Sequence, residues 1–419
     1  MKDFRTIILA AGKGVRMNSD TPKVLHPLCG KPMIQHVLAI AKSLGAAKTY
    51  VILGHKNEVV KKHLKGGEVI VIQKRLLGTA DAIKRAAHHF RNFKGDVLVL
   101  SGDTPLLQKE TIGHLIRKHR EANAACTFLT AATDCPKGYG RVIRNSQNQV
   151  AAIREELDAA PEEKEINEIN AGAYVFQSEK LFDAIKTIGL NRKKKEFYLT
   201  DMIRLFVEKN ETIETAATDD PSEALGINTR EDLACAASIL RRRILKRLMS
   251  QGVTVVDPET THIDCDVQVG RDTTIRPFVV IEGDVRIGNR CVIGPFCHIR
   301  PDSTIGDHVE VGNFSEVSRS ALGDGSFMKH FSFLGDARVG RRVNIGAGVV
   351  TANFDGKQKN TTTIKDGAFI GSDSILVAPV KIGKKAVTGA GCVVTRGTVI
   401  PDGSVAVGVP ARIKSRRKA

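Results

Sequence analysis

The chain has 419 residues, which is too long for one ordinary hydrophobic core, so two or three domains are expected. Its hydrophobic content of 42% is that of a globular protein, and no apolar run reaches membrane-spanning length, so we expect no membrane insertion. The net charge of +17 is compatible with nucleic acid, with anionic small substrates or with solvated helix faces. Nucleic acid is the least favoured partner, because aromatic residues make up only 5% and do not interleave with the basic clusters.

The eight cysteines are scattered and form no CxxC pair, which favours buried small hydrophobic residues over a metal site. The first residues lead directly into a short apolar run and do not show the organisation of a signal peptide. We therefore expect a cytoplasmic protein.

Residues 6–11 form a continuous apolar run that predicts a buried parallel strand. The run ends in a glycine-rich stretch, GKGVRM at 12–17, whose backbone N–H groups could approach a phosphate closely. Lys13, Arg16 and Lys23 add positive charge there. The stretch is neither a Walker A motif nor GxGxxG, so by itself it is a weak signal of phosphate binding.

Helical and strand patterns then alternate along the chain. Helices are expected over 32–45, 57–64 and 79–90, and strands over 50–53, 69–73 and 97–100. This alternation predicts a doubly wound, mostly parallel sheet, and such sheets bind ligands at the carboxyl ends of their strands. Residues 12–16, Gln73, Gly78, Thr79 and Asp103 all fall at or just past a strand end, so we expect them on one rim.

Asp103 is a carboxylate expected beside a phosphate-binding loop. It would be repelled by phosphate unless a hard cation lay between them, and Mg²⁺ accepts one or two carboxylates together with substrate phosphates. The alternative is a turn residue before Pro105.

The pattern of secondary structure over residues 143–226 is less regular. A strand is expected over 171–176 and helices over 179–187 and 199–208. Thr229 and Asp232 then form a capping-box pattern at the start of a long basic helix. We predict that this helix, in a linker over 229–252, joins a first domain over 1–228 to a second over 253–419.

The second domain carries a six-residue period. Ile or Val recurs at every sixth position from Ile263 to Val317, often followed by Gly. This period predicts a parallel β-helix, because each rung buries its aliphatic residue only by stacking on the next. The period is interrupted between Val317 and Val339 and again over 352–363, then continues to Ala406. Interruptions of this kind are typical of loops on a binding face, and the alternative is a purely structural β-helix.

These motifs together resemble one family, the bifunctional bacterial N-acetylglucosamine-1-phosphate uridyltransferase / glucosamine-1-phosphate acetyltransferases. The resemblance covers nearly the whole chain. It is carried by LAAGKGVRM at 9–17, PKVLH at 22–26, LGTA at 77–80, GYGR at 138–141, EIN at 168–170, GIN at 226–228, VGNF at 311–314, LGD at 334–336, NIGAG at 344–348, NFDG at 353–356 and GSD at 371–373.

The resemblance implies a Rossmann-like nucleotidyltransferase sheet followed by a left-handed parallel β-helix with a basic tail. The sheet domain would transfer a uridylyl group from UTP to N-acetylglucosamine 1-phosphate and release pyrophosphate. The implied residues are Leu9, Ala10, Ala11, Gly12, Gln73, Gly78 and Thr79 for the nucleotide, Arg16 and Lys23 for its phosphates, Asp103 and Asn228 for Mg²⁺, and Gly140, Glu155 and Asn170 for the sugar.

The β-helix would acetylate glucosamine 1-phosphate with acetyl-CoA, in a homotrimer whose product feeds peptidoglycan and lipopolysaccharide synthesis. A neutral amine must attack the thioester, and a histidine is suited to act as its base. The implied residues are His330 as the base, Glu316 to orient it, Arg300, Phe333, Asn344 and Lys359 for the sugar phosphate, and Ala347, Asn353, Phe354, Ser372 and Ala390 for acetyl-CoA, with Asn353 also placed to hold the sugar.

The chain departs from the family pattern at three positions. It has Val15 where the family usually has Thr, Ser318 where the family has Lys, and Phe333 where the family has Tyr. A lost charge-assisted phosphate contact at position 318 would cost roughly 1.5–3 kcal/mol. Arg319 or Lys329 could replace it.

Three alternatives stay open at the level of sequence. One is a related sugar-1-phosphate nucleotidyltransferase with another nucleotide or sugar and an inactive or altered-acceptor β-helix. The others are a regulatory scaffold with the same layout and a nucleic-acid binder.

Overall fold

The computed structural model describes residues 3–64, 66–191, 193 and 195–414. Of the predicted basic tail, only the part up to Lys414 lies within the described residues. The chain divides into two compact units, 1–237 and 238–419, and the division falls within one continuous helix, α8 (Arg230–Ser250). In the described part of the chain no helix is both long and apolar enough to cross a membrane.

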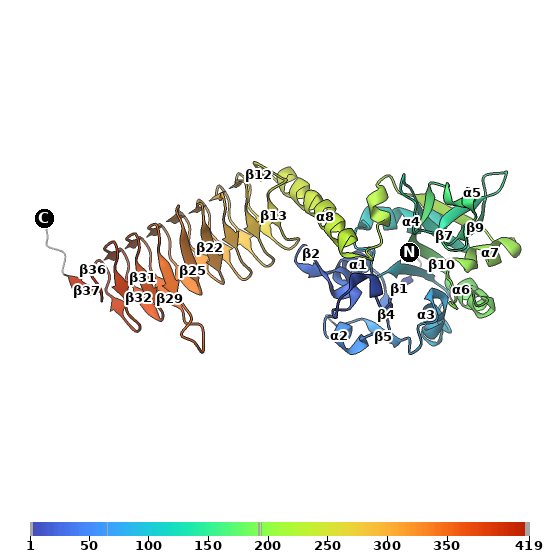
Figure 1. The fold of residues 1–419 in the computed structure, drawn as a ribbon, viewed down its shortest axis with the longest axis horizontal. Coiled ribbons are helices and arrows are strands. Elements are labelled where there is room, and N and C mark those ends of the chain that lie inside the picture. The colour runs from blue at the N-terminus through green and yellow to red at the C-terminus, as the bar shows by residue number, and fades with distance from the viewer. Residues whose placement is uncertain (1–2, 65, 192, 194, 415–419) are drawn as a thin grey trace. The chain divides into compact units, whose positions relative to one another are not determined.

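The first unit is built on a mixed sheet with the strand order β11-β7-β10-β6-β1-β4-β5, to which β8 and β9 attach through β10 (Figure 1). The pairs β1–β4, β1–β6, β4–β5 and β7–β11 are parallel, and β10 runs antiparallel to its neighbours. The strands of this unit are β1 (Phe4–Ala10), β2 (Pro27–Leu28), β3 (Lys31–Pro32), β4 (Lys48–Leu53), β5 (Val69–Ile72), β6 (Asp96–Ser101), β7 (Cys126–Ala132), β8 (Arg141–Arg144), β9 (Val150–Arg154), β10 (Glu168–Gln177) and β11 (Ile213–Ala217).

Helices cover both faces of this sheet. They are α1 (Met33–Ser43), α2 (Asn57–Lys61), α3 (Thr79–Arg85), α4 (Lys109–Glu121), α5 (Pro161–Lys164), α6 (Ser178–Ala184) and α7 (Asp201–Glu208), with short 3₁₀ helices η1 (Val15–Met17), η2 (Lys23–Leu25), η3 (Ala87–Phe90), η4 (Ile185–Thr187) and η5 (Pro221–Ala224). The predicted helix over 79–90 is therefore α3 followed by η3. The remaining expected helices of this unit end within a few residues of their predicted limits.

Strand β1 is buried on both faces, which explains its continuous apolar run. Ile8 belongs to the hydrophobic cluster that contains residues of α1 and α4, and Ile7 belongs to the cluster that contains residues of α3, α6 and α7. The chain leaves β1 toward β4 on one side and later forms β6 on the other side. The carboxyl ends of β1 and β6 therefore flank a topological switch point, where doubly wound sheets bind ligands.

The predicted capping box at the start of α8 is confirmed. Asp232 Oδ2 accepts a hydrogen bond from the Thr229 N–H at 2.8 Å, and Thr229 Oγ1 accepts one from the Asp232 N–H at 3.1 Å. Later in α8, Arg242 pairs with Glu259, and Arg247 donates to the Cys265 carbonyl. These two arginines of the basic cluster thus tie the helix to the first turns of the β-helix.

The second unit is a prism of three parallel sheets, stacked from β12 to β36 and closed by the antiparallel strand β37 (Figure 1). One sheet contains β12 (Thr254–Val255), β15 (Thr274–Ile275), β18 (Val292–Ile293), β21 (Glu310–Val311), β24 (Phe327–Met328), β27 (Asn344–Ile345), β30 (Phe369–Ile370), β33 (Val387–Thr388), β36 (Val405–Val407) and β37 (Arg412–Lys414). The second contains β13 (His262–Ile263), β16 (Val280–Ile281), β19 (His298–Ile299), β22 (Ser315–Ser318), β25 (Ser332–Gly335), β28 (Val350–Ala352), β31 (Ile375–Val377) and β34 (Val393–Val394). The third contains β14 (Gln268–Val269), β17 (Arg286–Ile287), β20 (Thr304–Ile305), β23 (Ala321–Leu322), β26 (Ala337–Val339), β29 (Thr362–Ile364), β32 (Val380–Ile382) and β35 (Val399–Ile400).

The hexapeptide period gives this prism its geometry, as predicted, and the fold is the left-handed β-helix of hexapeptide repeats. Ile263 lies beside Ile281 one full turn later, and both side chains are buried. The glycines allow adjacent turns to approach closely. A Cβ at Gly270 would lie 2.6 Å from the Gly288 carbonyl oxygen, and one at Gly312 would lie 1.8 Å from the carbonyl oxygen of Lys329.

The predicted interruption after Val317 is wrong as a break in the ladder. All three sheets continue through this region, and the buried residues are Leu322, Met328, Leu334 and Val339. Two corners are one residue shorter than the others. Counting every sixth residue therefore no longer lands on the buried positions, although the strands continue. The second interruption is a real insertion between β28 and β29, closed by a bridge between Phe354 and Lys359.

Candidate functional site

The first unit carries a crevice of about 240 Å³ at the carboxyl ends of β1, β5 and β6. It is lined by all seven residues predicted to hold a nucleotide, namely Leu9, Ala10, Ala11, Gly12, Gln73, Gly78 and Thr79, together with Lys23 and Asp103. Sequence reasoning did not identify Glu196, which also lines the crevice. Strand ends that are far apart in sequence meet here because parallel strands share one edge.

Gln73 is buried and its side-chain amide is held in one orientation. The amide nitrogen donates to the Gly78 carbonyl at 3.0 Å and to Asp81 Oδ2 at 2.8 Å. Both N–H donors are thus used, so the group that this amide can offer a ligand is its carbonyl oxygen. Asp81, which sequence reasoning missed, is in turn held by Arg85 four residues later.

Gly78 must be glycine at this position. Its φ is +101°, and a Cβ would lie 2.5 Å from the Phe197 carbonyl oxygen. The next residue, Thr79, accepts a hydrogen bond through Oγ1 from the Leu199 N–H at 2.9 Å. The segment around residues 196–199 therefore forms a fixed wall of the crevice.

Lys23, Asp103 and Asn228 meet at the floor of this site. The Lys23 ammonium forms an ion pair with Asp103 and donates to Asn228 Oδ1 at 3.0 Å. The two oxygens predicted to hold a metal ion therefore converge on one cation, the Lys23 ammonium. No group of three or more His, Cys, Asp or Glu side chains suitable for a metal occurs among the described residues. Two protein oxygens suit a hard cation that takes its remaining ligands from water and phosphate.

A second hollow of about 310 Å³ in this unit contains Arg16, Asn170 and Asn228. Asn170 is fixed there, because its Nδ2 donates to the Tyr174 hydroxyl at 2.6 Å. Lys137, Tyr139 and Asp232 also line the hollow and were not predicted from the sequence.

Of the other two predicted sugar residues, Gly140 contacts Asn170, whereas Glu155 contacts Thr200, which does not line this hollow. The Gly140 carbonyl accepts from the Asn170 N–H at 2.9 Å, and a Cβ at Gly140 would lie 2.9 Å from Ile153 Cγ2. Glu155 Oε1 accepts from the Thr200 hydroxyl at 2.8 Å. Burial raises the pKa of the Tyr198 phenol above its usual value, and the negative charge of Glu155 raises it further.

The second unit carries an open groove of about 670 Å³. It brings together the predicted base His330, the predicted sugar ligand Asn344, and the predicted acetyl-CoA residues Ala347, Ser372 and Ala390. His330 lies at the exposed corner between β24 and β25, not in an inserted loop as the sequence suggested. Its carbonyl accepts from the Ser315 hydroxyl at 3.0 Å, which fixes the corner to the preceding turn.

The Glu316 carboxylate contacts Arg300. Arg300 Nη1 lies 3.1 Å from Glu316 Oε1. The backbone of Glu316 pairs with that of Phe333 in the next turn of the same sheet. The role of Glu316 in orienting His330 stays a prediction, and the cation that its carboxylate contacts is Arg300 on the preceding turn.

Asn353, Phe354 and Lys359 belong to the end of β28 and the inserted loop. Asn353 is buried and its amide donates to Asp336, whereas Phe354 is 61% exposed. Asp355 anchors the loop through Arg396 at 3.1 Å and accepts hydrogen bonds from the backbone N–H groups of residues 357 and 358, which hold the pKa of its carboxyl well below the usual range.

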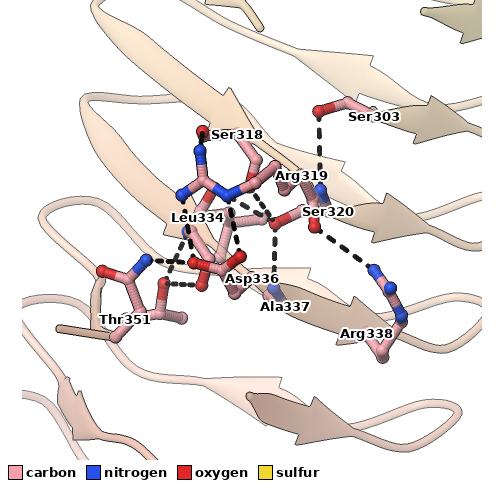
Figure 2. Close-up of polar contacts among 11 residues, drawn as sticks. Ser303, Ser318, Arg319, Ser320, Leu334, Asp336, Ala337, Arg338 and Thr351 are labelled. Atoms are coloured by element: carbon pink, nitrogen blue, oxygen red, sulfur yellow. Dashed lines mark hydrogen bonds and ion pairs between the residues drawn. The ribbon is translucent and has the colours of Figure 1, made fainter. Parts of the chain in front are cut away.

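Asp336 also binds Arg319, and Figure 2 shows that this arginine reaches back to the Ser318 hydroxyl. Ser318, one of the three positions at which the chain departs from the family pattern, thus belongs to a polar cluster with Arg319 and Asp336.

Comparison with known proteins gives two family matches. A model described as a MobA-like NTP transferase domain matches residues 6–201. A model described as bacterial transferase hexapeptide (six repeats) matches residues 284–319 and 361–396. The gap between the two hexapeptide matches contains the shortened corners and the inserted loop.

Three relatives are each called "Bifunctional protein GlmU". The relative from Shouchella clausii is 44% identical over 422 residues, which is 93% of each chain. The relative from Pelotomaculum thermopropionicum is 44% identical over 414 residues and covers 90% of each chain. The relative from Desulfitobacterium hafniense (strain DSM 10664 / DCB-2) is 40% identical over 440 residues, with 97% of this chain and 96% of the relative covered.

Proposed function

Because this chain belongs to the family of bifunctional GlmU proteins, we propose that it acetylates glucosamine 1-phosphate and then uridylylates the product to UDP-N-acetylglucosamine. It is an enzyme that combines a nucleotidyltransferase domain with a hexapeptide transferase domain. The observation that carries the proposal is the crevice in which Gln73, Gly78 and Lys23 meet Asp103 at the switch point of the sheet.

In uridylyl transfer, a phosphate oxygen of N-acetylglucosamine 1-phosphate attacks the α-phosphorus of UTP. The bond from that phosphorus to the bridging oxygen breaks, and pyrophosphate leaves. The protein contributes alignment and charge neutralisation, because the phosphoryl groups themselves supply the bonds that change. Arg16 and Lys23 would neutralise the phosphates, and Asn170 would orient the sugar.

The orientation of the Gln73 side-chain amide bears on which nucleobase the crevice can bind. With both of its N–H donors held by Gly78 and Asp81, its carbonyl can only accept. Uracil presents an N3–H donor, whereas the N3 of cytosine is an acceptor. A Gln73 carbonyl that faces N3 of the base would therefore favour uracil or thymine over cytosine.

We propose Mg²⁺ as the divalent metal, held by Asp103 and Asn228. When bound it would neutralise charge on the nucleotide phosphates. Lys23 would then leave these two oxygens, and its ammonium would be free to face the α-phosphate.

In acetyl transfer, the amine of glucosamine 1-phosphate attacks the thioester carbonyl of acetyl-CoA. His330 would accept the proton of the amine, and the CoA thiolate would leave as the amide forms. The groove beside His330 supports this reaction, since Asn344, Ala347 and Ser372 also line it. We further propose a cytoplasmic homotrimer in which this open groove is completed by a second copy.

The test is acetyl transfer to glucosamine 1-phosphate, measured as free thiol released from acetyl-CoA, with His330→Ala beside the parent. Loss of a general base should reduce kcat by about 10²–10⁴-fold, with uridylyl transfer unchanged. Asn344→Ala is a useful comparison, because a lost sugar contact should raise KM more than it lowers kcat.

Absence of acetyl transfer in the parent, with uridylyl transfer intact, would refute the bifunctional proposal. It would favour the second candidate, a sugar-1-phosphate nucleotidyltransferase with an altered-acceptor β-helix. Pyrophosphate release with UTP, dTTP and CTP tests the base preference argued for Gln73.

A further inference from the structure

The end of β22 carries a polar cluster that the proposed mechanism does not use. Ser318 is buried, and the next residue, Arg319, has a left-handed backbone conformation with φ of 49°. The Arg319 side chain folds back so that its Nη1 donates to the Ser318 hydroxyl at 2.7 Å (Figure 2). The guanidinium thus lies beside the side chain of residue 318.

Asp336, one turn further along the β-helix, fixes this guanidinium. Arg319 Nε donates to Asp336 Oδ1 at 2.8 Å, and Nη2 donates to Oδ2 at 3.0 Å (Figure 2). Asn353 donates to the same carboxylate from the following turn. A two-point contact of this kind holds the plane of an arginine and lowers the entropy lost when it binds a ligand.

The guanidinium keeps binding capacity. Arginine has five N–H donors, and the described contacts of its side-chain nitrogens use three of them. The side chain is 33% exposed, and two of its N–H donors make none of the contacts described for its side-chain nitrogens.

Charged side chains of both signs lie around this guanidinium. Arg300 lies on the preceding turn and pairs with Glu316, and the charges of Asp336, Asp302 and Glu316 act on Arg319. Lys359 is close enough to help lower the pKa of the Asp336 carboxyl, although Arg319 has the larger effect. Arg300, Arg319 and Lys359 therefore lie among three carboxylates, those of Asp302, Glu316 and Asp336.

Lys329, which lines the groove beside His330, is the other cation that could contact the phosphate. It lies 3.0 Å from Glu310 and over the ring of Phe327, both on the sheet that contains β21 and β24. Arg319 instead lies on the sheet that carries Arg300 and Phe333.

We propose that Arg319, held by Asp336 and Ser318, binds the phosphate of the acetyl acceptor and makes the acetyltransferase specific for a sugar 1-phosphate. This inference rests on the proposed acetyl transfer to glucosamine 1-phosphate. It assigns to Arg319 the charge-assisted contact that a serine at position 318 cannot make.

The test compares two acceptors, glucosamine 1-phosphate and glucosamine, in the parent and in Arg319→Met. Loss of the contact should raise KM for glucosamine 1-phosphate by roughly 10- to 100-fold, with kcat within about threefold. The kcat/KM for glucosamine, which has no phosphate, should stay within about threefold of the parent. Arg319→Lys, which keeps the charge but loses the fork, should give an intermediate KM.

Arg341→Met is the matched control, because Arg341 also pairs with an aspartate, Asp324, elsewhere on the β-helix. It should leave both acceptors unchanged. Arg319→Met combined with Asp336→Asn removes the unpaired carboxylate, so it isolates the phosphate contact if the single variant unfolds. Adding Ser318→Lys to Arg319→Met should recover part of the lost affinity.

An equal loss with both acceptors in the folded variants would overturn the inference and make Arg319 a structural residue. An unchanged KM for glucosamine 1-phosphate would overturn it too. If the parent itself does not acetylate glucosamine 1-phosphate, the proposed function fails, and this outcome is distinct from an active parent whose Arg319 variants behave like Arg341→Met.

Discussion

The Lys23 side chain has one position in this structure and is expected to take another when a metal ion binds. Its ammonium contacts Asp103 and Asn228, the residues proposed to hold the metal, and its side chain is only 13% exposed. A divalent cation and an ammonium cannot share these oxygens, because like charges at this separation repel. Metal binding should therefore compete with Lys23 and release it toward the nucleotide.

We expect Lys23→Met to bind Mg²⁺ or Mn²⁺ several-fold more tightly than the parent in the absence of nucleotide, since the competing ammonium is gone. Asp103→Asn should bind the metal more weakly than the parent. Calorimetric titration of the nucleotide-free protein measures both effects without reference to activity. Lys13→Met, a change of a neighbouring exposed lysine, serves as the control. Equal metal affinity in Lys23→Met and the parent would contradict competition.

At the scale of elements, the corners of the β-helix are held by a ladder of side-chain acceptors. Asp307 Oδ1 accepts from the Asn289 N–H at 2.7 Å, and Asp402 Oδ1 accepts from the Lys384 N–H at 2.8 Å in a later turn. These backbone hydrogen bonds hold the pKa values of both carboxyls below their usual range. The corners thus depend on ionised carboxylates.

A lowered folded-state pKa stabilises the fold above the unfolded-state pKa, about 4, and this contribution is lost as the pH falls through the folded-state value. We therefore expect the β-helix to lose stability progressively below about pH 4. Asp307→Asn keeps an acceptor oxygen but removes the titration, so its unfolding temperature should depend less on pH in this window. Thermal unfolding followed by circular dichroism between pH 2 and 7 measures the difference. Asp284→Asn is the control, and an identical pH profile for Asp307→Asn and the parent would count against the argument.

Elements were predictable to different degrees from the sequence. The strand β1, the helix α8 and most rungs follow from local periodicity and capping, which nearby residues determine. The shortened corners after Val317 were missed, because one deleted residue shifts the count while the stacking of Leu322 and Met328 on neighbouring turns preserves the strands.

At the scale of the whole molecule, the β-helix exposes a column of aromatic rings. Phe278, Phe296 and Phe314 stack with centroid separations of 4.7 and 5.1 Å on successive turns and are 50%, 45% and 65% exposed. Contiguous exposed apolar surface of this kind is typical of protein–protein interfaces. It supports the proposal of a homotrimer.

We expect the full chain to sediment as a trimer, and Phe296→Asp to shift it toward the monomer, because a charge would be buried in the apolar contact. Acetyl transfer should fall with the trimer, while uridylyl transfer is retained. Sedimentation velocity of the parent, Phe296→Asp and the conservative control Phe296→Leu measures this. A monomeric parent that is fully active in acetyl transfer would contradict the proposed assembly.

The sequence by itself determined the element types, the two architectures and the family, because hydrophobic periods and short motifs are local properties of the chain. Only the tertiary structure decided which charges meet. Lys23 lies 80 residues from Asp103 and 205 from Asn228, and Arg319 is paired with Asp336 on the next turn, while Glu316 is paired with Arg300 on the preceding one. Such pairings depend on strand order and on how the turns stack, and a charged side chain takes the nearest partner that the fold provides.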